Sequence, residues 1–86
     1  MFTINSKLEI DHLVVLERDR KIFAAARSSG HLYLFLVNED SGSVYSRNSS
    51  TDSWERVMET DRRLILARIT AARNRQIPIY RIRSSL

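Results

Sequence analysis

The stretch HLYLFLV at residues 31–37 decides the fold. Its three leucines occupy every second position and would project from one side of an extended strand, because side chains alternate across a strand. Tyr33, Phe35 and Val37 would project from the other side. A strand with two apolar sides is typical of the centre of a sheet, or of a sheet that meets a second subunit through one face.

Two strands are expected before this stretch, with a shorter extended segment at residues 8–11 in front of them. Residues 13–16 (LVVL) have the length and β-branched content of a strand that is covered on both faces. Residues 21–27 (KIFAAAR) leave two alternatives, because three alanines favour a helix while the short length and the turn at residues 28–30 favour a strand. We expect a strand that pairs back onto residues 13–17 and leaves room above its alanines for a helix.

A turn is predicted at residues 38–42 (NEDSG), followed by a short polar strand at residues 43–47 (SVYSR), placed at an edge of the sheet. A long helix is then predicted from Trp54 to about Arg73. Asp52, just before it, and Glu55, three residues later, have the spacing of a capping box. The apolar residues that share one face of this helix at a period near 3.6 are Trp54, Val57, Met58, Ile65, Ile69 and Ala72, with Leu64 at the edge.

After the helix, Asn74 is expected to provide a left-handed stop. Pro78 keeps Ile77 out of helical conformation and suits the start of an edge strand, which residues 79–83 (IYRIR) would form. The sequence therefore predicts an α+β fold as one domain over residues 1–86. An antiparallel meander sheet of three to five strands would carry one long C-terminal helix on one face and a short terminal strand, in the order β-β-β-β-α-β.

The size and composition exclude several classes of protein. A chain of 86 residues forms a modest core, and proteins of this size often dimerise to cover apolar surface. The chain has no cysteine, which excludes disulfides, thiolate metal sites and cysteine nucleophiles. The first residues lack the pattern of a signal peptide, and no apolar run is long enough to span a bilayer. A cytoplasmic protein without membrane attachment is expected.

The sequence has no catalytic or metal-binding motif, and we expect neither an enzyme nor a bound cofactor. His12 and His31 could in principle perform acid–base chemistry, but no third group accompanies them and both fall at strand edges. Glu39 and Asp40 are adjacent acids in a turn, where carboxylates are usually solvated, and the alternating ligands of a calcium loop are missing.

Positive charge collects in the C-terminal third of the chain. The net charge is +4, and every acid lies at or before Asp61. Helix dipole effects and i,i+4 ion pairs explain most of the charge along the helix without any ligand. The residues that these effects do not explain are Arg73, Arg75, Tyr80, Arg81 and Arg83. This basic group could bind phosphates or an acidic partner, or it could be a solvated basic end.

One charge pair on the helix indicates self-association. Asp61 and Arg68 both fall within the mainly apolar face and are symmetric about Leu64 and Ile65. If two helices packed antiparallel about that midpoint, Asp61 of each copy would meet Arg68 of the other. The alternative is that both side chains extend to solvent from the edge of the intramolecular core.

These observations favour a small non-enzymatic protein-interaction or regulatory module that forms a homodimer. Its expected partners are a second copy of itself and another protein, and its contact surface would be strand 31–37 or the helix face. The alternative is a nucleic-acid-binding protein that uses the arginine-rich helix end and the C-terminal tail.

Overall fold

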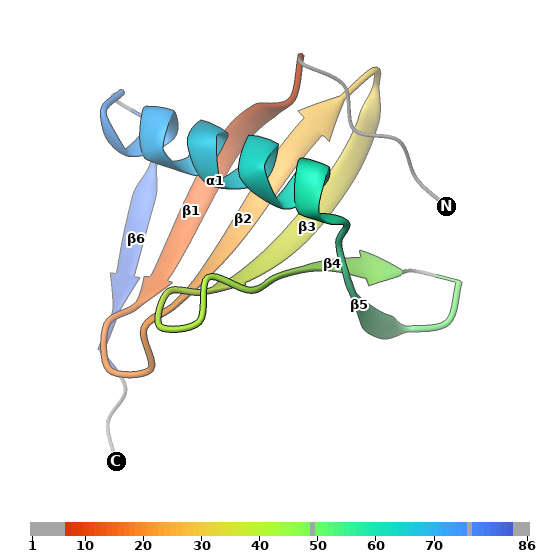
Figure 1. Ribbon diagram of the computed structural model, residues 1–86. Helices are drawn as coiled ribbons and strands as arrows, with labels where there is room; N and C mark the ends of the chain where they lie inside the picture. Colours follow the sequence, from red (N-terminus) through yellow and green to blue (C-terminus); the bar gives the residue numbers. More distant parts are fainter. Residues whose placement is uncertain (1–6, 49, 76, 84–86) are drawn as a thin grey trace.

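The computed structural model describes residues 7–48, 50–75 and 77–83. Its elements along the chain are β1 (Glu9–Leu16), β2 (Lys21–Ser28), β3 (His31–Asn38), β4 (Val44–Asn48), β5 (Ser53–Arg56), α1 (Glu59–Arg73) and β6 (Ile79–Ile82). The strands form one sheet in the order β5-β4-β3-β2-β1-β6, and α1 crosses one face of it (Figure 1). The predicted α+β class is confirmed, although the sheet has six strands rather than three to five.

The first four strands form the predicted antiparallel meander. Strands β2 and β3 pair along their whole length, from Lys21 opposite Asn38 to Ser28 opposite His31. The segment with three alanines is therefore a strand and not a helix. Ala24 and Ala26 are buried on the side of the sheet that carries α1, so their small side chains leave room for the helix.

Strand β1 joins two segments that the sequence suggested were separate. Its pairing with β2 shifts between Ile10 and His12, which is a β-bulge. The extra residue changes which positions point inward. As a result Ile10 and Leu13, three residues apart, both reach the core, as Val15 does.

Strand β6 departs from the antiparallel pattern because it runs parallel to β1. The helix returns the chain across the sheet before β6, as a parallel connection requires. The backbone N–H of Leu13 donates to the carbonyl of Pro78 at 3.2 Å. The edge position predicted from Pro78 is confirmed, since a proline without an N–H is tolerated at the edge of a sheet.

The predicted start of the helix at Trp54 is wrong. Residues 53–56 form β5, which pairs with β4, so β4 is not the edge strand that its polar composition suggested. The Trp54 ring packs against Phe23, with 6.3 Å between ring centroids. This contact with β2 outweighs the helical spacing of Trp54 and Val57.

The predicted helix caps are also wrong at both ends. Asp52 lies in the left-handed region at a φ of 55°, and the residue before the helix is Met58, without a side-chain cap. Asn74 is right-handed, with φ −87° and ψ −4°, and its N–H donates to the carbonyl of Ala71 at 3.2 Å. The last turn thus tightens into i→i+3 bonds instead of reversing direction.

An ion pair stabilises the first turn of α1. Arg62 donates from Nε and Nη2 to the two oxygens of Glu59 at 2.8 and 2.6 Å, and Arg63 adds a bond at 3.3 Å. The hydrogen bond from Arg62 is the main cause that lowers the pKa of Glu59 to about 2. Since the folded pKa lies below the ordinary value, this stabilisation is present above about pH 4.5 and is lost as the pH falls toward 2.

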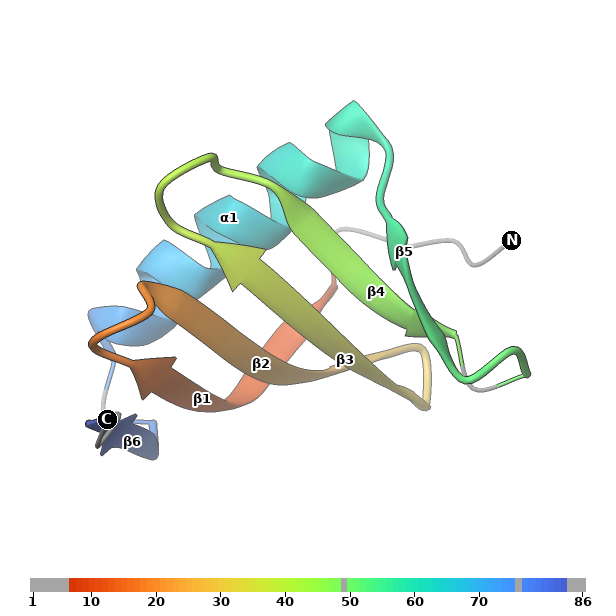
Figure 2. The same cartoon turned by 90° about the horizontal axis from the view of Figure 1, so that it is seen from below.

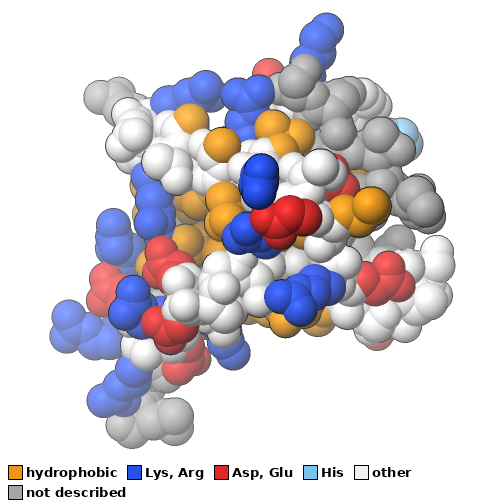
Figure 3. Space-filling model, viewed as in Figure 1, with side chains coloured by type: hydrophobic (Ala, Val, Ile, Leu, Met, Phe, Trp, Pro, Cys, Tyr) orange, Lys and Arg blue, Asp and Glu red, His pale blue; other side chains and the backbone are white. Residues whose placement is uncertain are grey.

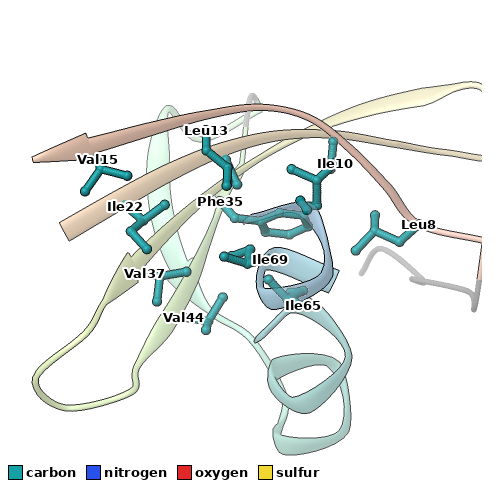
Figure 4. Packing of buried hydrophobic residues seen from close by; sticks show 13 residues of the cluster. Leu8, Ile10, Leu13, Val15, Ile22, Phe35, Val37, Val44, Ile65 and Ile69 are labelled. Carbon is teal, nitrogen blue, oxygen red and sulfur yellow. The ribbon is translucent and has the colours of Figure 1, made fainter. Parts of the chain in front are cut away.

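The core lies between α1 and the inner face of the sheet (Figure 4). Phe35 is its largest fully buried side chain. Ile65, Ile69 and Ala72 of α1 are buried against the sheet, so this part of the predicted apolar helix face is confirmed. In the described part of the chain, no helix has the length and apolar content that a bilayer crossing requires.

Candidate functional site

The two faces of the sheet differ in what covers them. Helix α1 covers the inner face, and Figure 2 shows that no described element covers the opposite face. We call this opposite face the open face. Because side chains alternate along each strand, the neighbours of the buried residues project from it. Its apolar side chains come from all six strands: Val14, Leu16, Phe23, Ala25, Leu32, Leu34, Leu36, Tyr45, Trp54, Tyr80 and Ile82.

The open face holds most of the exposed apolar surface of the described residues. Six large hydrophobic side chains among them are exposed by a third or more of their surface. Five project from the open face: Leu32 (66%), Leu34 (46%), Trp54 (36%), Tyr80 (54%) and Ile82 (50%). The sixth is Met58, which lies just before the helix. Contiguous exposed apolar surface of this kind is typical of interaction sites.

Aromatic rings extend the open face toward both edges of the sheet. On one side Phe23 meets Trp54, and the guanidinium carbon of Arg47 lies 5.7 Å from the centre of the Trp54 ring. On the other side the His12 and Tyr80 rings stack, with centroids 6.2 Å apart. The Phe23 and Trp54 rings are tilted by 58° to each other, whereas the His12 and Tyr80 rings are nearly parallel.

Charged groups project from the open face on β1 and β2, where Glu9 and Lys21 lie, as well as on β4 and β5. Arg47 and Arg56 lie at the β4–β5 side, where Arg47 pairs with Asp52 and Arg56 donates to the neutral hydroxyl of Ser43 at 3.3 Å. Arg27, at one end of β2, is bound by Asp11 at 2.9 and 3.3 Å. At the β6 side the face carries Tyr80 and Ile82, which are uncharged.

The structure divides the predicted basic group between the two faces of the sheet. Tyr80 belongs to the open face, whereas Arg81, the next residue, points to the side of α1. There Arg73 and Arg81 line an open groove of about 500 Å³ together with Arg20. We call it the arginine groove. Arg75 is exposed after the end of the helix and does not line it.

The arginine groove contains its own carboxylates. Arg73 donates to Glu39 at 2.8 Å, and Glu17 lies 3.8 Å from both Arg81 and Arg83. Figure 3 shows basic and acidic side chains mixed where the β1–β2 turn approaches the end of β6. These carboxylates compete with any phosphate for the same guanidinium groups. Nucleic-acid binding through these arginines therefore stays a prediction without added support.

Ile65, at the centre of the predicted helix–helix interface, is occupied within the chain. Ile65 is fully buried against the sheet, so it cannot also face a second copy. Leu64 packs on the edge of the core, and Asp61 and Arg68 are half-buried. The apolar face of the helix is thus used within the chain. Among the described elements, none covers the open face of the sheet.

The histidines do not form a site with acidic groups. His12 stacks on Tyr80 in the open face, and His31 starts β3 opposite Ser28. In the described ranges, no three histidine, aspartate or glutamate side chains are grouped so that they could hold a metal ion.

The sequence singled out strand 31–37, which lies in the open face, but not the other strands of that face. Trp54 was assigned to the helix, and Tyr80 to the basic group. The signal that could have identified them is the alternation of apolar side chains in strands β4 to β6, which is too short in each strand to be decisive alone. No protein-family model, curated protein or solved structure matches this chain.

Proposed function

We propose that this chain is a small non-enzymatic protein-interaction module that acts as a homodimer through its open face. The observation that carries the proposal is the position of the exposed apolar side chains, five of which project from this one surface. Leu32 and Leu34 lie on β3, near the middle of the sheet. A central apolar cluster with charged groups at the margin is the usual anatomy of a protein interface.

The size of the open face suits a dimer of this chain. Six strands at the usual spacing of about 4.8 Å span about 24 Å, and strands of eight residues are about 26 Å long. The face has a flat outline of roughly 600 Å², and the accessible surface of its projecting side chains is larger than that outline and comparable with the roughly 800 Å² per partner of a standard stable interface. Two open faces in contact would form a sandwich with a second apolar layer, as packed antiparallel sheets do.

Dimerisation would also add to the stability of a small fold. The core has one layer of side chains between the sheet and a helix of 15 residues. A fold of this size gains little net free energy from a single core. Association that occurs only in the folded state shifts the folding equilibrium toward that state.

Sedimentation equilibrium of the native chain tests the proposal. We expect a mass of twice the 10.0 kDa of one chain at micromolar concentrations, with dissociation on dilution. A mass of 10.0 kDa at every concentration up to the millimolar range would contradict the homodimer. Ionic strength provides a control, because an apolar interface should persist at high salt whereas one held by exposed ion pairs would weaken.

A further inference from the structure

We infer that the second copy packs on the open face about a two-fold axis that runs parallel to the strands, between β2 and β3. The β5 edge of each copy then lies over the β6 edge of its partner. This arrangement rests on the proposed homodimer and specifies its geometry. Symmetry allows two simple arrangements, and the charges and side-chain sizes of the open face favour this one.

Only two simple arrangements let two identical sheets meet face to face with their strands aligned. The two-fold axis lies in the plane between the sheets, either along the strands or across them. In the order β5-β4-β3-β2-β1-β6, an axis along the strands places β5 over the partner's β6 and β3 over the partner's β2. An axis across the strands places β5 over the partner's β5.

The charges of the open face favour the axis along the strands. With an axis across the strands, Arg47 and Arg56 would face the same two cations of the partner, and like charges at an interface are unfavourable. With the axis along the strands, Arg56 lies over Tyr80 of the partner subunit. Arg47, one strand further in, lies over His12 of the partner subunit. Arg56, whose described hydrogen bond is to a neutral hydroxyl, can then contact an aromatic face as a cation–π pair.

The sizes of the central side chains also fit this axis. Leu34 pairs with Ala25, and Leu36 with Phe23, in the β2–β3 ladder. An axis along the strands preserves the height of each residue, so it sets Leu34 over Ala25 of the partner subunit. A large side chain then meets a small one at this height, as in interdigitating apolar layers. Two residues along, the same axis sets Leu36 over Phe23 of the partner subunit, where two large side chains meet. Sheets packed in this way cross at about 30°. Pairs at the edges, about 12 Å from the axis at the usual strand spacing, are displaced by about 6 Å along the strands, which is roughly two residues.

Crosslinking with introduced cysteines tests the arrangement, and the native chain helps because it contains none. The variant Arg56→Cys/Tyr80→Cys would be treated with a short bismaleimide, whose reach matches the roughly 10 Å between packed sheets. Arg56→Cys and Tyr80→Cys alone are the matched controls. Within one chain the two positions lie five strands apart, about 24 Å at the usual strand spacing, so the reagent cannot join them intramolecularly.

The inference predicts covalent dimers from the double variant, at least tenfold more than from either single variant. Efficient crosslinking of Arg56→Cys alone would overturn it in favour of an axis across the strands. A double variant that sediments as a dimer but gives no crosslink would also overturn it and would leave the homodimer standing. A native chain that sediments as a monomer would remove the homodimer itself, and this inference with it.

Discussion

Replacing Leu34 by glutamate is expected to convert the dimer into a folded monomer. Leu34 lies on β3, close to the centre of the open face, and 46% of its surface is exposed in the single chain. Glutamate is therefore tolerated in the monomer, where water reaches it. In the dimer it would be an unpaired charge within an apolar interface, which costs several kcal/mol.

We expect the dissociation constant of Leu34→Glu to rise at least about 100-fold, which corresponds to roughly 2.7 kcal/mol. Sedimentation equilibrium measures the change, and circular dichroism checks that the strands and the helix remain. Ala67→Glu is the matched control, because it adds the same charge at an exposed position on α1. The prediction fails if Leu34→Glu stays dimeric, or if Ala67→Glu dissociates the dimer equally well.

Replacing Phe35 by alanine should destabilise the fold of each chain, although Phe35 is the neighbour of Leu34, whose replacement should affect only the dimer. Phe35 points to the inner face and is fully buried under α1. Its removal leaves a cavity that the surrounding helix and sheet fill only in part. The free energy of unfolding is expected to fall by about 3–5 kcal/mol, which is a large part of the stability of a small domain.

Urea unfolding measures this loss, with the Leu34→Glu chain as background so that unfolding is not coupled to dissociation. Leu32→Ala in the same background is the control, because Leu32 is 66% exposed on the open face. Its cost should stay below about 1 kcal/mol. Equal losses for Phe35→Ala and Leu32→Ala would show that the two faces of β3 have been assigned incorrectly.

The central part of the fold was predictable because its strands pair with their neighbours in sequence. Alternation in residues 31–37 and the turns at residues 28–30 and 38–42 were sufficient for the meander. The β-bulge in β1 and the parallel pairing of β6 were not predictable, because each depends on contacts that are distant in the chain. No local pattern specifies which strand β6 joins.

The start of the helix shows how a helical period can mislead. Trp54, Val57 and Met58 have the spacing of a helix face, and Asp52 with Glu55 resembles a capping box. The chain instead places Trp54 against Phe23, since an extended segment at this point can extend the sheet. Helical periodicity over a single turn is weak evidence for a helix when a large aromatic side chain can pack against a residue that is distant in the chain.

The candidate site was predictable only in part for a similar reason. The two apolar sides of strand 31–37 indicated a central strand or a face that meets a second subunit. Strand β3 is an interior strand of the sheet, and contact with a second subunit stays a prediction. The residues of the predicted basic group do not share one surface, because Tyr80 and Arg81 are consecutive in a strand and so point to opposite faces. The acids that accompany the arginines come from turns far away in sequence, such as Glu39 and Glu17.

The central claim is that two copies of the chain meet through their open faces. An isotope-filtered NOE experiment on a mixture of labelled and unlabelled chains tests it most directly, because it detects only contacts between copies. We predict intermolecular NOEs among the side chains of Leu34, Leu36 and Ala25. Intermolecular NOEs confined to α1, for example at Leu64 or Leu66, or none in a sample that sediments as a dimer, would contradict the claim.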